Sequence, residues 1–502
     1  MIAPGPVTQR RLERRPERST VWPLLLTGLA GWWLITRVAS IRLGLWWDEA
    51  FTAQRYVREG PGTLLDPDAY VANNHVLFSA LTWASTQVTG EADPWLRLWA
   101  VLPAAVATVV LVGWLWQRSG PVVASLAATM TVTSTLWLSM STQARGYGLV
   151  VLAGTVLLVV VVHEDRMPTW GGDLLVAGSG LVAMATFPPT VALYLAHTGV
   201  WLLRRRTARL RLVALTAVVG LVTALLYLPL MAMLFERADR VGSRFADPIS
   251  WWSPVIAPLQ LVGGPSFGVG TGLGTVTSRD VTAAVGGMEI GLGVGSLPGI
   301  VALLVGLLGL FIVVARIDRP LGGHLVAGLG GSIVLLAPAG FHLADRYIAF
   351  LLPHVTVALA FGLAGLCGAF ATAPRSWTPA ATAALAVGLV VASAPVVWQA
   401  ATTPLQAFAP AAEVMRDDPD ATILVDKYHI GYRWYLDDLP VERVTDQAEL
   451  DARLCDPQEP VFFAPDPDRP ELEVPSCLSS ENERRFVHQR EPGFLQLWVA
   501  EP

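Results

Sequence analysis

Lysine and charge are scarce in this chain of 502 residues. Lys427 is the only lysine, and charged residues make up 15% of the sequence while hydrophobic residues make up 53%. Soluble globular domains carry about 25% charged residues. The composition therefore argues against a soluble enzyme and indicates an integral membrane protein. The sequence also lacks a basic stripe interleaved with aromatic residues, which argues against nucleic acid as a partner.

Two further signals are missing. The basic leader is not followed by a small-residue cleavage site, so we expect the first apolar run to stay in the protein as a membrane anchor. No internal sequence repeat is visible, which weakens the alternative of a transporter built from inverted repeats.

Long apolar runs dominate the first four fifths of the chain. About 20 apolar residues are enough to cross the hydrocarbon core of a bilayer as a helix. Two short runs meet at Pro188 and Pro189, and proline interrupts a helix, so this pair is either a tight hairpin or one broken helix. We predict about eleven spans, at 22–41, 95–117, 121–139, 148–163, 174–187, 189–203, 210–235, 297–315, 324–341, 347–371 and 379–399.

The arginines predict the orientation of these spans. Positive residues gather in cytoplasmic loops, and arginine clusters lie at 10–18, before the first span, and at 204–211, after the sixth. Both clusters are cytoplasmic only if an even number of spans separates them, which the hairpin supplies. The loops holding Arg316 and Arg375 then also face the cytoplasm. We therefore predict a multi-pass cell-membrane protein with a cytoplasmic N-terminus.

The tail at 403–502 differs in composition from the membrane part at 1–402. It is richer in proline and acidic residues, and strand-like runs such as 422–425 and 460–463 alternate with helix-like runs such as 447–454. This pattern predicts a small α/β domain. The topology places that domain outside the cytoplasm. There it either helps to bind a substrate or shape the entrance to a site, or it passively caps and stabilises the external loops.

Three cysteines are present, and two of them fall in this tail. Cys367 lies in a predicted span, whereas Cys455 and Cys477 both lie in the predicted external domain. An oxidising compartment allows such a pair to form a disulfide. The alternative is two unpaired thiols.

Two long loops, 48–94 and 236–296, are predicted on the same external side. The first contains aromatic-rich stretches suited to the membrane interface. The second contains a glycine-rich run at 263–274, which follows no strand and lies away from cytoplasmic nucleotides. We therefore interpret that run as a flexible lid rather than a dinucleotide site.

An acidic pair, Asp48 and Glu49, lies where the first span ends, among Trp46, Trp47 and Phe51. Carboxylates at a membrane boundary are costly unless they are solvated, capped or functional. The pair therefore marks a place where a reaction on a lipid-linked substrate is expected.

Four motifs extend this observation: Trp47–Thr52, Asn74–Phe78, Leu96–Trp99 and Ala144–Tyr147. Together they resemble membrane glycosyltransferases of the GT-C superfamily, in the glycosyltransferase family 39-like branch of protein O-mannosyltransferases and the aminoarabinose transferase of lipid A. The resemblance covers about the first 170 residues by motif and the rest by topology. It implies a GT-C-like all-α membrane fold, a polyprenyl-phosphate sugar as donor, with mannose favoured, and an acidic catalytic residue in the first external loop. The bias toward arginine is typical of GC-rich genomes and suggests an actinobacterial source.

One motif departs from the family pattern. The family has His-Pro-Pro after the first interfacial helix, whereas this sequence has His75, Val76 and Leu77. The difference leaves the conformation of this loop, and the type of acceptor, open.

Asp48 is the candidate general base. A sugar hydroxyl is a poor nucleophile, so a carboxylate must take its proton as the new bond forms. Glu49 projects about 100° away on a helix, so we assign it to orienting the surroundings of Asp48 or binding the acceptor. The alternative for Asp48 is a helix N-cap, a role that contributes about 1 kcal/mol.

The departing polyprenyl phosphate needs positive donors at the external boundary. Arg145 is one candidate, and a second set comprises His342, Arg346 and Tyr347, beside Asp345. Arginine suits phosphate because its planar fork presents two donors. The alternative is that each arginine extends to lipid headgroups.

The predicted substrate-binding residues also include Tyr147, Asn74 and His75. Tyr147 and Tyr347 are either substrate contacts or interface anchors. Asn74 and His75 are predicted to contact substrate, although a lone interfacial histidine is often a hydrogen-bonded structural group. No cluster has metal-ligand spacing, so no metal site and no cofactor are predicted. The alternative for His75 is to hold a divalent ion together with Asp48, so dependence on a divalent metal stays open.

These observations predict an inverting glycosyltransferase that acts on the outer face of the membrane. The acceptor hydroxyl belongs to a protein, a glycolipid or a cell-wall polysaccharide, and membrane lipids surround the enzyme. A transporter or flippase of lipid-linked saccharides is the main alternative. That function calls for ionisable residues along a path at mid-membrane, whereas here they gather at the boundaries. A structural membrane protein would need neither Asp48 nor the external arginines.

Overall fold

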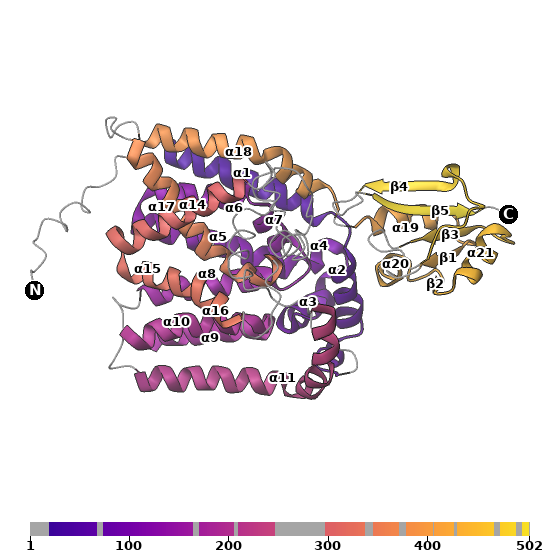
Figure 1. Cartoon of the computed structure of the whole chain (residues 1–502), viewed down its shortest axis with the longest axis horizontal. Helices are drawn as coiled ribbons and strands as arrows, with labels where there is room; N and C mark the ends of the chain where they lie inside the picture. The colour runs from indigo at the N-terminus through magenta and orange to yellow at the C-terminus, as the bar shows by residue number, and fades with distance from the viewer. Residues whose placement is uncertain are drawn as a thin grey trace, which may run out of the picture.

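The structure is a computed structural model, in which a bundle of helices carries a small sheet at one end (Figure 1). It describes residues 20–67, 74–163, 170–204, 209–245, 297–336, 345–370, 378–404, 406–425, 429–465, 472–487 and 494–500. The architecture is the predicted one: a mostly helical multi-pass membrane fold followed by a C-terminal mixed sheet.

Each predicted span range contains a helix of the bundle. The bundle comprises α1 (Val21–Ile41), α5 (Leu98–Ser119), α6 (Pro121–Thr133), α7 (Thr135–Thr142), α8 (Tyr147–His163), α9 (Trp170–Thr186), α10 (Val191–Arg204), α11 (Arg209–Phe245), α14 (Leu297–Ile312), α15 (Arg319–Val326), α16 (Ser332–Leu336), α17 (Leu352–Phe370) and α18 (Thr378–Thr402). Among the described residues, six helical segments are long and apolar enough to cross a membrane, or seven if the bent pair α6 and α7 is one span. Short π-helical segments, η8 (Val313–Ile317) and η9 (Ala327–Gly331), flank α15.

Two details refine the predicted spans. The range predicted as one span at 121–139 is broken at Ser134, whose hydroxyl caps α7 by accepting from the Trp137 N–H, and α6 and α7 meet at 68°. The Pro-Pro segment forms a hairpin: the short 3₁₀ turn η4 (Pro188–Thr190) separates α9 from α10. Gly180 packs directly on the Tyr194 ring across this hairpin.

The interior of the bundle is apolar around α8, which is buried along most of its length. A cluster of three buried histidines also lies inside the bundle. His197 on α10 contacts His324 on α15 through their Nδ1 atoms, 3.1 Å apart, and His354 on α17 through their Nε2 atoms, 2.8 Å apart. These contacts tie three helices together, because a buried polar group in an apolar interior needs a polar partner.

Short helices cover the end of the bundle that faces the sheet (Figure 1). They are α2 (Trp47–Thr52), its π-helical continuation η2 (Ala53–Arg58), η3 (Pro61–Thr63), α3 (Val76–Thr89) and α4 (Asp93–Leu96). This is the segment in which the sequence motifs are concentrated.

In its described residues, the C-terminal unit is a five-stranded mixed sheet with three α-helices and a short 3₁₀ helix, η13 (Ser480–Asn482). Its strands are β1 (Thr422–Val425), β2 (Val441–Arg443), β3 (Val461–Ala464), β4 (Glu483–Val487) and β5 (Phe494–Ala500), and its helices are α19 (Phe408–Arg416), α20 (His429–Tyr435) and α21 (Gln447–Cys455). The strand order is β2-β1-β3-β5-β4. β2, β1 and β3 are parallel, with Thr422 opposite Val461, and β5 pairs antiparallel with both β3 and β4. The apolar runs of β1 and β3 fill the centre of the sheet.

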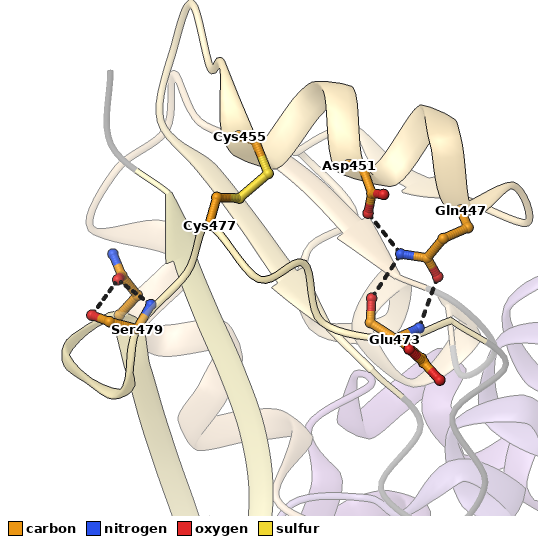
Figure 2. Close-up of a disulfide and its surroundings, with 7 residues drawn as sticks. Gln447, Asp451, Cys455, Glu473, Cys477 and Ser479 are labelled. Atoms are coloured by element: carbon orange, nitrogen blue, oxygen red, sulfur yellow. Dashed lines mark hydrogen bonds between the residues drawn. A yellow bond between two sulfur atoms is a disulfide. The ribbon is translucent and has the colours of Figure 1, made fainter.

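A disulfide fastens one loop of this unit (Figure 2). Cys455, at the end of α21, is bonded to Cys477, and their Cα atoms are 5.6 Å apart. Gln447, at the start of the same helix, accepts from the Glu473 N–H at 2.8 Å and donates to the Glu473 carbonyl at 2.9 Å. The loop before β4 is therefore held at both ends of α21.

Candidate active site

The acidic pair lies in the first turn of α2, directly after the connection from α1. Trp46 is the N-cap residue and is extended, with φ −88° and ψ 172°. Asp48 and Glu49 follow it and are 7% and 1% exposed. Acidic side chains suit this position because the first turn of a helix carries a partial positive charge. Since Trp46 is the N-cap residue, the cap interpretation of Asp48 does not describe this helix.

Glu49 is bound tightly to the surrounding backbone and to Arg97. Its two oxygens accept from Arg97 Nε at 3.1 Å and from Arg97 Nη2 at 2.8 Å, a two-point ion pair. They also accept from the backbone N–H groups of Trp46 and Ala144. Four donors therefore converge on one buried carboxylate.

Arg97 uses its other donors to hold the end of α1. They bind the carbonyl oxygens of Ser40, Ile41, Leu43 and Gly44. Glu49 and Arg97 together thus join the end of α1, the start of α2, the start of α5 and the turn before α8. Removing either partner would leave a buried charge, which typically costs about 3–5 kcal/mol.

Asp48 meets Arg145, a residue almost a hundred positions away. Arg145 Nη1 lies 2.5 Å from Asp48 Oδ2, and Arg145 is fully buried. The guanidinium also lies over the Tyr147 ring, 5.3 Å from its centroid. Two predicted site residues are therefore in direct contact at the end of the bundle.

His75 and Tyr147 complete this cluster. The His75 ring stacks on Phe187, with centroids 5.4 Å apart, and meets Tyr147 edge-on at 4.7 Å. Gly146 permits this packing, because a Cβ there would lie 2.2 Å from Thr186 and 2.9 Å from His75 Nδ1. The motif residues from Arg145 to Tyr147 therefore pack with His75 in one buried cluster.

Asn74 lies beside the cluster but binds its own loop. Its amide donates to the Leu64 carbonyl at 3.3 Å, and its carbonyl accepts from the Ser79 hydroxyl at 3.0 Å. These contacts assign Asn74 to shaping the loop before α3.

The second predicted phosphate set is only partly described. His342 lies outside the described residues. Arg346 and Tyr347 belong to the 3₁₀ helix η11 (Asp345–Leu351), of which the backbone is described. η11 packs on α8, since a Cβ on Gly154 would lie 2.9 Å from the Phe350 carbonyl.

A cleft opens beside Glu49. Its walls come from the end of α1, from α7 and from the end of α18, and they include Glu49 and Arg97 but not Asp48. Ser40, Thr135 and Thr142 are among the other lining residues. The cleft therefore lies next to the carboxylate that Arg97 holds.

Arg97 belongs to one of the sequence motifs, but it was not predicted to be a site residue. The signal was present: an arginine at the start of a span, with its fork available to a carboxylate. Contacts from the C-terminal unit were also not predicted. Tyr435 and Gln406 reach the segment that leads into α2, and no local pattern reveals such long-range contacts.

The arrangement brings a carboxylate, an arginine and aromatic rings together at the end of a membrane bundle. Such a set can accept a proton, stabilise a departing anion and pack against a sugar ring.

No protein-family model matches the sequence, and no curated protein matches it significantly. Solved structures do match. ArnT from Cupriavidus metallidurans in the apo state aligns with TM-score 0.55 and 13% identity, over 97% of this chain and 100% of that one. The same protein bound to undecaprenyl phosphate aligns with TM-score 0.53 and 14% identity, over 96% and 100%. An oligosaccharyltransferase from Archaeoglobus fulgidus aligns with TM-score 0.48 and 11% identity, over 89% and 68%. The two ArnT structures show that the chain has an ArnT-like fold.

Proposed function

We propose that the protein is an inverting glycosyltransferase that moves a sugar from a polyprenyl phosphate to an acceptor hydroxyl on the outer face of the cell membrane. The single observation that carries the proposal is the contact between Asp48 and Arg145, 2.5 Å long. It joins a carboxylate fit to act as base with a cation fit to hold phosphate. The ArnT fold supports the proposal, since one ArnT structure holds undecaprenyl phosphate.

Asp48 acts as the general base. The acceptor O–H gives its proton to the carboxylate as the hydroxyl oxygen bonds to the anomeric carbon. The bond from that carbon to the phosphate oxygen breaks, and its electron pair leaves with the polyprenyl phosphate. Attack from the face opposite the phosphate inverts the configuration at this carbon.

Arg145 stabilises the departing phosphate. Its fork presents several N–H donors in one plane, which matches phosphate oxygens better than a point charge does. Burial strengthens this interaction, because the site has a lower dielectric than water. Tyr147 supports the guanidinium from below, and His75 fixes Tyr147 in turn.

Arg346 is proposed as a second phosphate contact. It lies four residues before Phe350, whose carbonyl faces Gly154 on α8. A 3₁₀ helix rises about 2 Å per residue. The Arg346 backbone therefore lies about 8 Å along η11 from this contact with α8. We keep Tyr347 and His342 as candidate contacts of the same set.

Glu49 serves as a scaffold. Its four donors hold it in place, so its part is to fix the turn that presents Asp48. The cleft beside it is the proposed approach for the acceptor or the sugar. Mannose is the proposed sugar, and a cell-envelope glycan, lipid or protein is the proposed acceptor, both on the family resemblance. The N-terminus is proposed to be cytoplasmic and the unit at 403–502 extracytoplasmic.

The test is transfer of radiolabelled mannose from polyprenyl-phosphate mannose in membranes that contain the full chain. Asp48→Asn keeps the shape of the side chain and removes its basicity. The expected loss is about a hundredfold or more, the size of a missing general base. Asp173→Asn is the matched control, because Asp173 is also buried and pairs with an arginine, Arg211, outside the site. The control should keep its activity.

Other results would overturn parts of the proposal. Equal transfer by wild type and Asp48→Asn would remove Asp48 from the chemistry. Wild-type transfer from another polyprenyl-phosphate sugar but not from mannose would overturn mannose alone. No transfer, together with movement of a lipid-linked saccharide across proteoliposomes, would favour the transporter alternative.

A further inference from the structure

Three consecutive backbone N–H groups precede Asp48, and a side chain holds each of them. The Trp46 N–H donates to Glu49 at 3.1 Å. The Leu45 N–H donates to the Tyr435 hydroxyl, and the Trp47 N–H donates to Gln406 Oε1 at 2.9 Å. The two outer acceptors come from the C-terminal part of the chain, after α18. The backbone that enters α2 is therefore clamped from outside the membrane bundle.

Tyr435 has a defined orientation in this clamp. Its hydroxyl accepts from Leu45 and donates to Asp93 Oδ2 at 2.8 Å, while Trp434 Nε1 donates to Asp93 Oδ1 at 3.3 Å. Burial and the negative charge of Asp93 raise the pKa of Tyr435. The hydroxyl therefore keeps the proton that it donates to Asp93. A single oxygen thus links the segment that leads into α2 to the first residue of α4.

The packing around the clamp is close and apolar. A Cβ on Gly44 would lie 2.7 Å from the Ala409 Cβ and 3.0 Å from the Tyr435 hydroxyl oxygen, so only glycine allows this approach. Trp434 is 6% exposed and shares a hydrophobic cluster with Leu45 and Ala50. Gln406 is fully buried. These contacts exclude water, which makes the hydrogen bonds of the clamp costly to break.

A second contact lies at the rim. Arg58, at the end of η2, lies over the Trp434 ring at 4.4 Å and pairs with Asp437 at 3.3 Å. Arg58 is about one third exposed, so this contact adds less than the buried hydrogen bonds do. This contact attaches the end of η2 to the C-terminal unit as well.

We propose that the C-terminal unit sets the position of Asp48, and that Tyr435 and Gln406 are positioning residues for the reaction. The inference rests on the proposed function, because it takes Asp48 as the base. Neither residue needs to touch substrate. Each fixes an amide within three positions of Asp48, and an error of about 1 Å at a reacting group can cost about a hundredfold in rate.

Two variants test the clamp in the full chain. Tyr435→Phe removes the acceptor of Leu45 and keeps the ring. Gln406→Leu removes the acceptor of Trp47 and keeps the approximate volume. Tyr432→Phe is the matched control: it removes a hydroxyl from the same helix, from a ring that packs on Phe408, with centroids 5.0 Å apart. All four proteins are compared in nanodiscs.

The first readout is amide hydrogen exchange, which does not depend on any transfer activity. Loss of one buried hydrogen bond should speed exchange about fivefold or more. We expect this at Leu45 in Tyr435→Phe, at Trp47 in Gln406→Leu, and at neither amide in Tyr432→Phe. Unchanged exchange in both clamp variants would overturn the inference whatever the activity.

The second readout is steady-state transfer from the polyprenyl-phosphate sugar. A positioning role predicts a kcat about tenfold lower in each clamp variant and a donor KM within about twofold of wild type. Tyr432→Phe should match wild type. Faster exchange with unchanged kcat would overturn the positioning role. If wild type transfers no sugar at all, the proposed function fails, and the exchange data still decide whether the C-terminal unit clamps α2.

If Tyr435→Phe does not fold, Gln406→Leu carries both readouts. Gln406 lies before α19 and outside the sheet, so replacing its side chain leaves the core of the C-terminal unit intact.

Discussion

Asp48 and Glu49 are neighbours in one helical turn, yet the protein holds their carboxylates in different ways. Glu49 is 1% exposed and receives a two-point ion pair from Arg97 together with two backbone N–H groups. Asp48 is 7% exposed and meets Arg145 end-on, through Nη1. Since the two side chains project about 100° apart, Glu49 can hold the turn in place while Asp48 faces the substrate. The difference separates a scaffold from a proposed catalytic group.

The largest expected effect lies on the scaffold side. Arg97→Gln leaves Glu49 buried without its two-point partner, so unfolding free energy should fall by about 3–5 kcal/mol. Thermal and denaturant unfolding of the purified protein in detergent measure it. Arg55→Gln is the control, because the exposed pair between Arg55 and Glu59 is worth at most about 0.5 kcal/mol. Equal stability of the two variants would contradict the scaffold role.

A stability loss far from the pair should leave turnover intact. Replacing Cys455 and Cys477 with serine opens a loop of 22 residues, which corresponds to about 3 kcal/mol in the chain-entropy description. We expect the C-terminal sheet to unfold at lower temperature while transfer per folded molecule stays at the wild-type level below that temperature. A parallel loss of transfer in the fully folded variant would mean that stability and catalysis are not separable here.

The reaction side should respond to a change that keeps charge. Arg145→Lys preserves one positive charge but removes the planar fork that suits phosphate. Transfer should fall about tenfold, which corresponds to about 1.4 kcal/mol. The same exchange at Arg97 should mainly lower stability, because there the fork holds Glu49 and the end of α1. The kcat and the unfolding free energy of both variants should therefore be measured. Equal losses of kcat and of stability in the two variants would contradict the different roles of Arg145 and Arg97.

The smallest expected effect concerns pH. Burial raises the pKa of Asp93, which accepts hydrogen bonds from Tyr435 and Trp434. Between the pKa of Asp93 in the unfolded chain and its raised pKa in the folded protein, the folded protein holds a proton on Asp93 that the unfolded chain has lost. The contribution of Asp93 to stability should therefore fall as the pH rises between these two pKa values, and level off above the raised one. Melting temperatures of wild type and Asp93→Asn from about pH 4 to about pH 7 test this, and the variant should lack the decline. A melting-temperature difference between wild type and Asp93→Asn that stays constant over this pH range would contradict the assignment.

Local patterns were sufficient to predict the helices. Apolar length predicted a helix in every span range, because a bilayer leaves a segment few other ways to satisfy its backbone. The doubled proline left a hairpin and a broken helix open, and the arginine clusters favoured the hairpin that lies between α9 and α10. The break at Ser134 was missed, since a serine cap inside an apolar run gives only a weak signal.

Partners that meet through space were harder to predict. Asp48 and Arg145 were each predicted from their motifs, but their contact follows from the packing of α2 against the turn before α8. Arg97 was named only as part of a motif, because no local pattern shows that it pairs with Glu49. Tyr435 and Gln406 give no local signal at all. Their role depends on where the C-terminal unit docks, and sequence patterns do not encode that position.

The most direct test of the account measures Asp48→Asn and Glu49→Gln side by side, with turnover per folded molecule and melting temperature determined for each. The account predicts that Asp48→Asn loses about a hundredfold or more in kcat per folded molecule, and that its melting temperature also falls, because the buried Arg145 loses the negative charge beside it. Glu49→Gln should lose melting temperature and keep turnover per folded molecule within about tenfold. The reverse pattern, with Asp48→Asn active and Glu49→Gln stable but inactive, would contradict the division of roles between the two carboxylates.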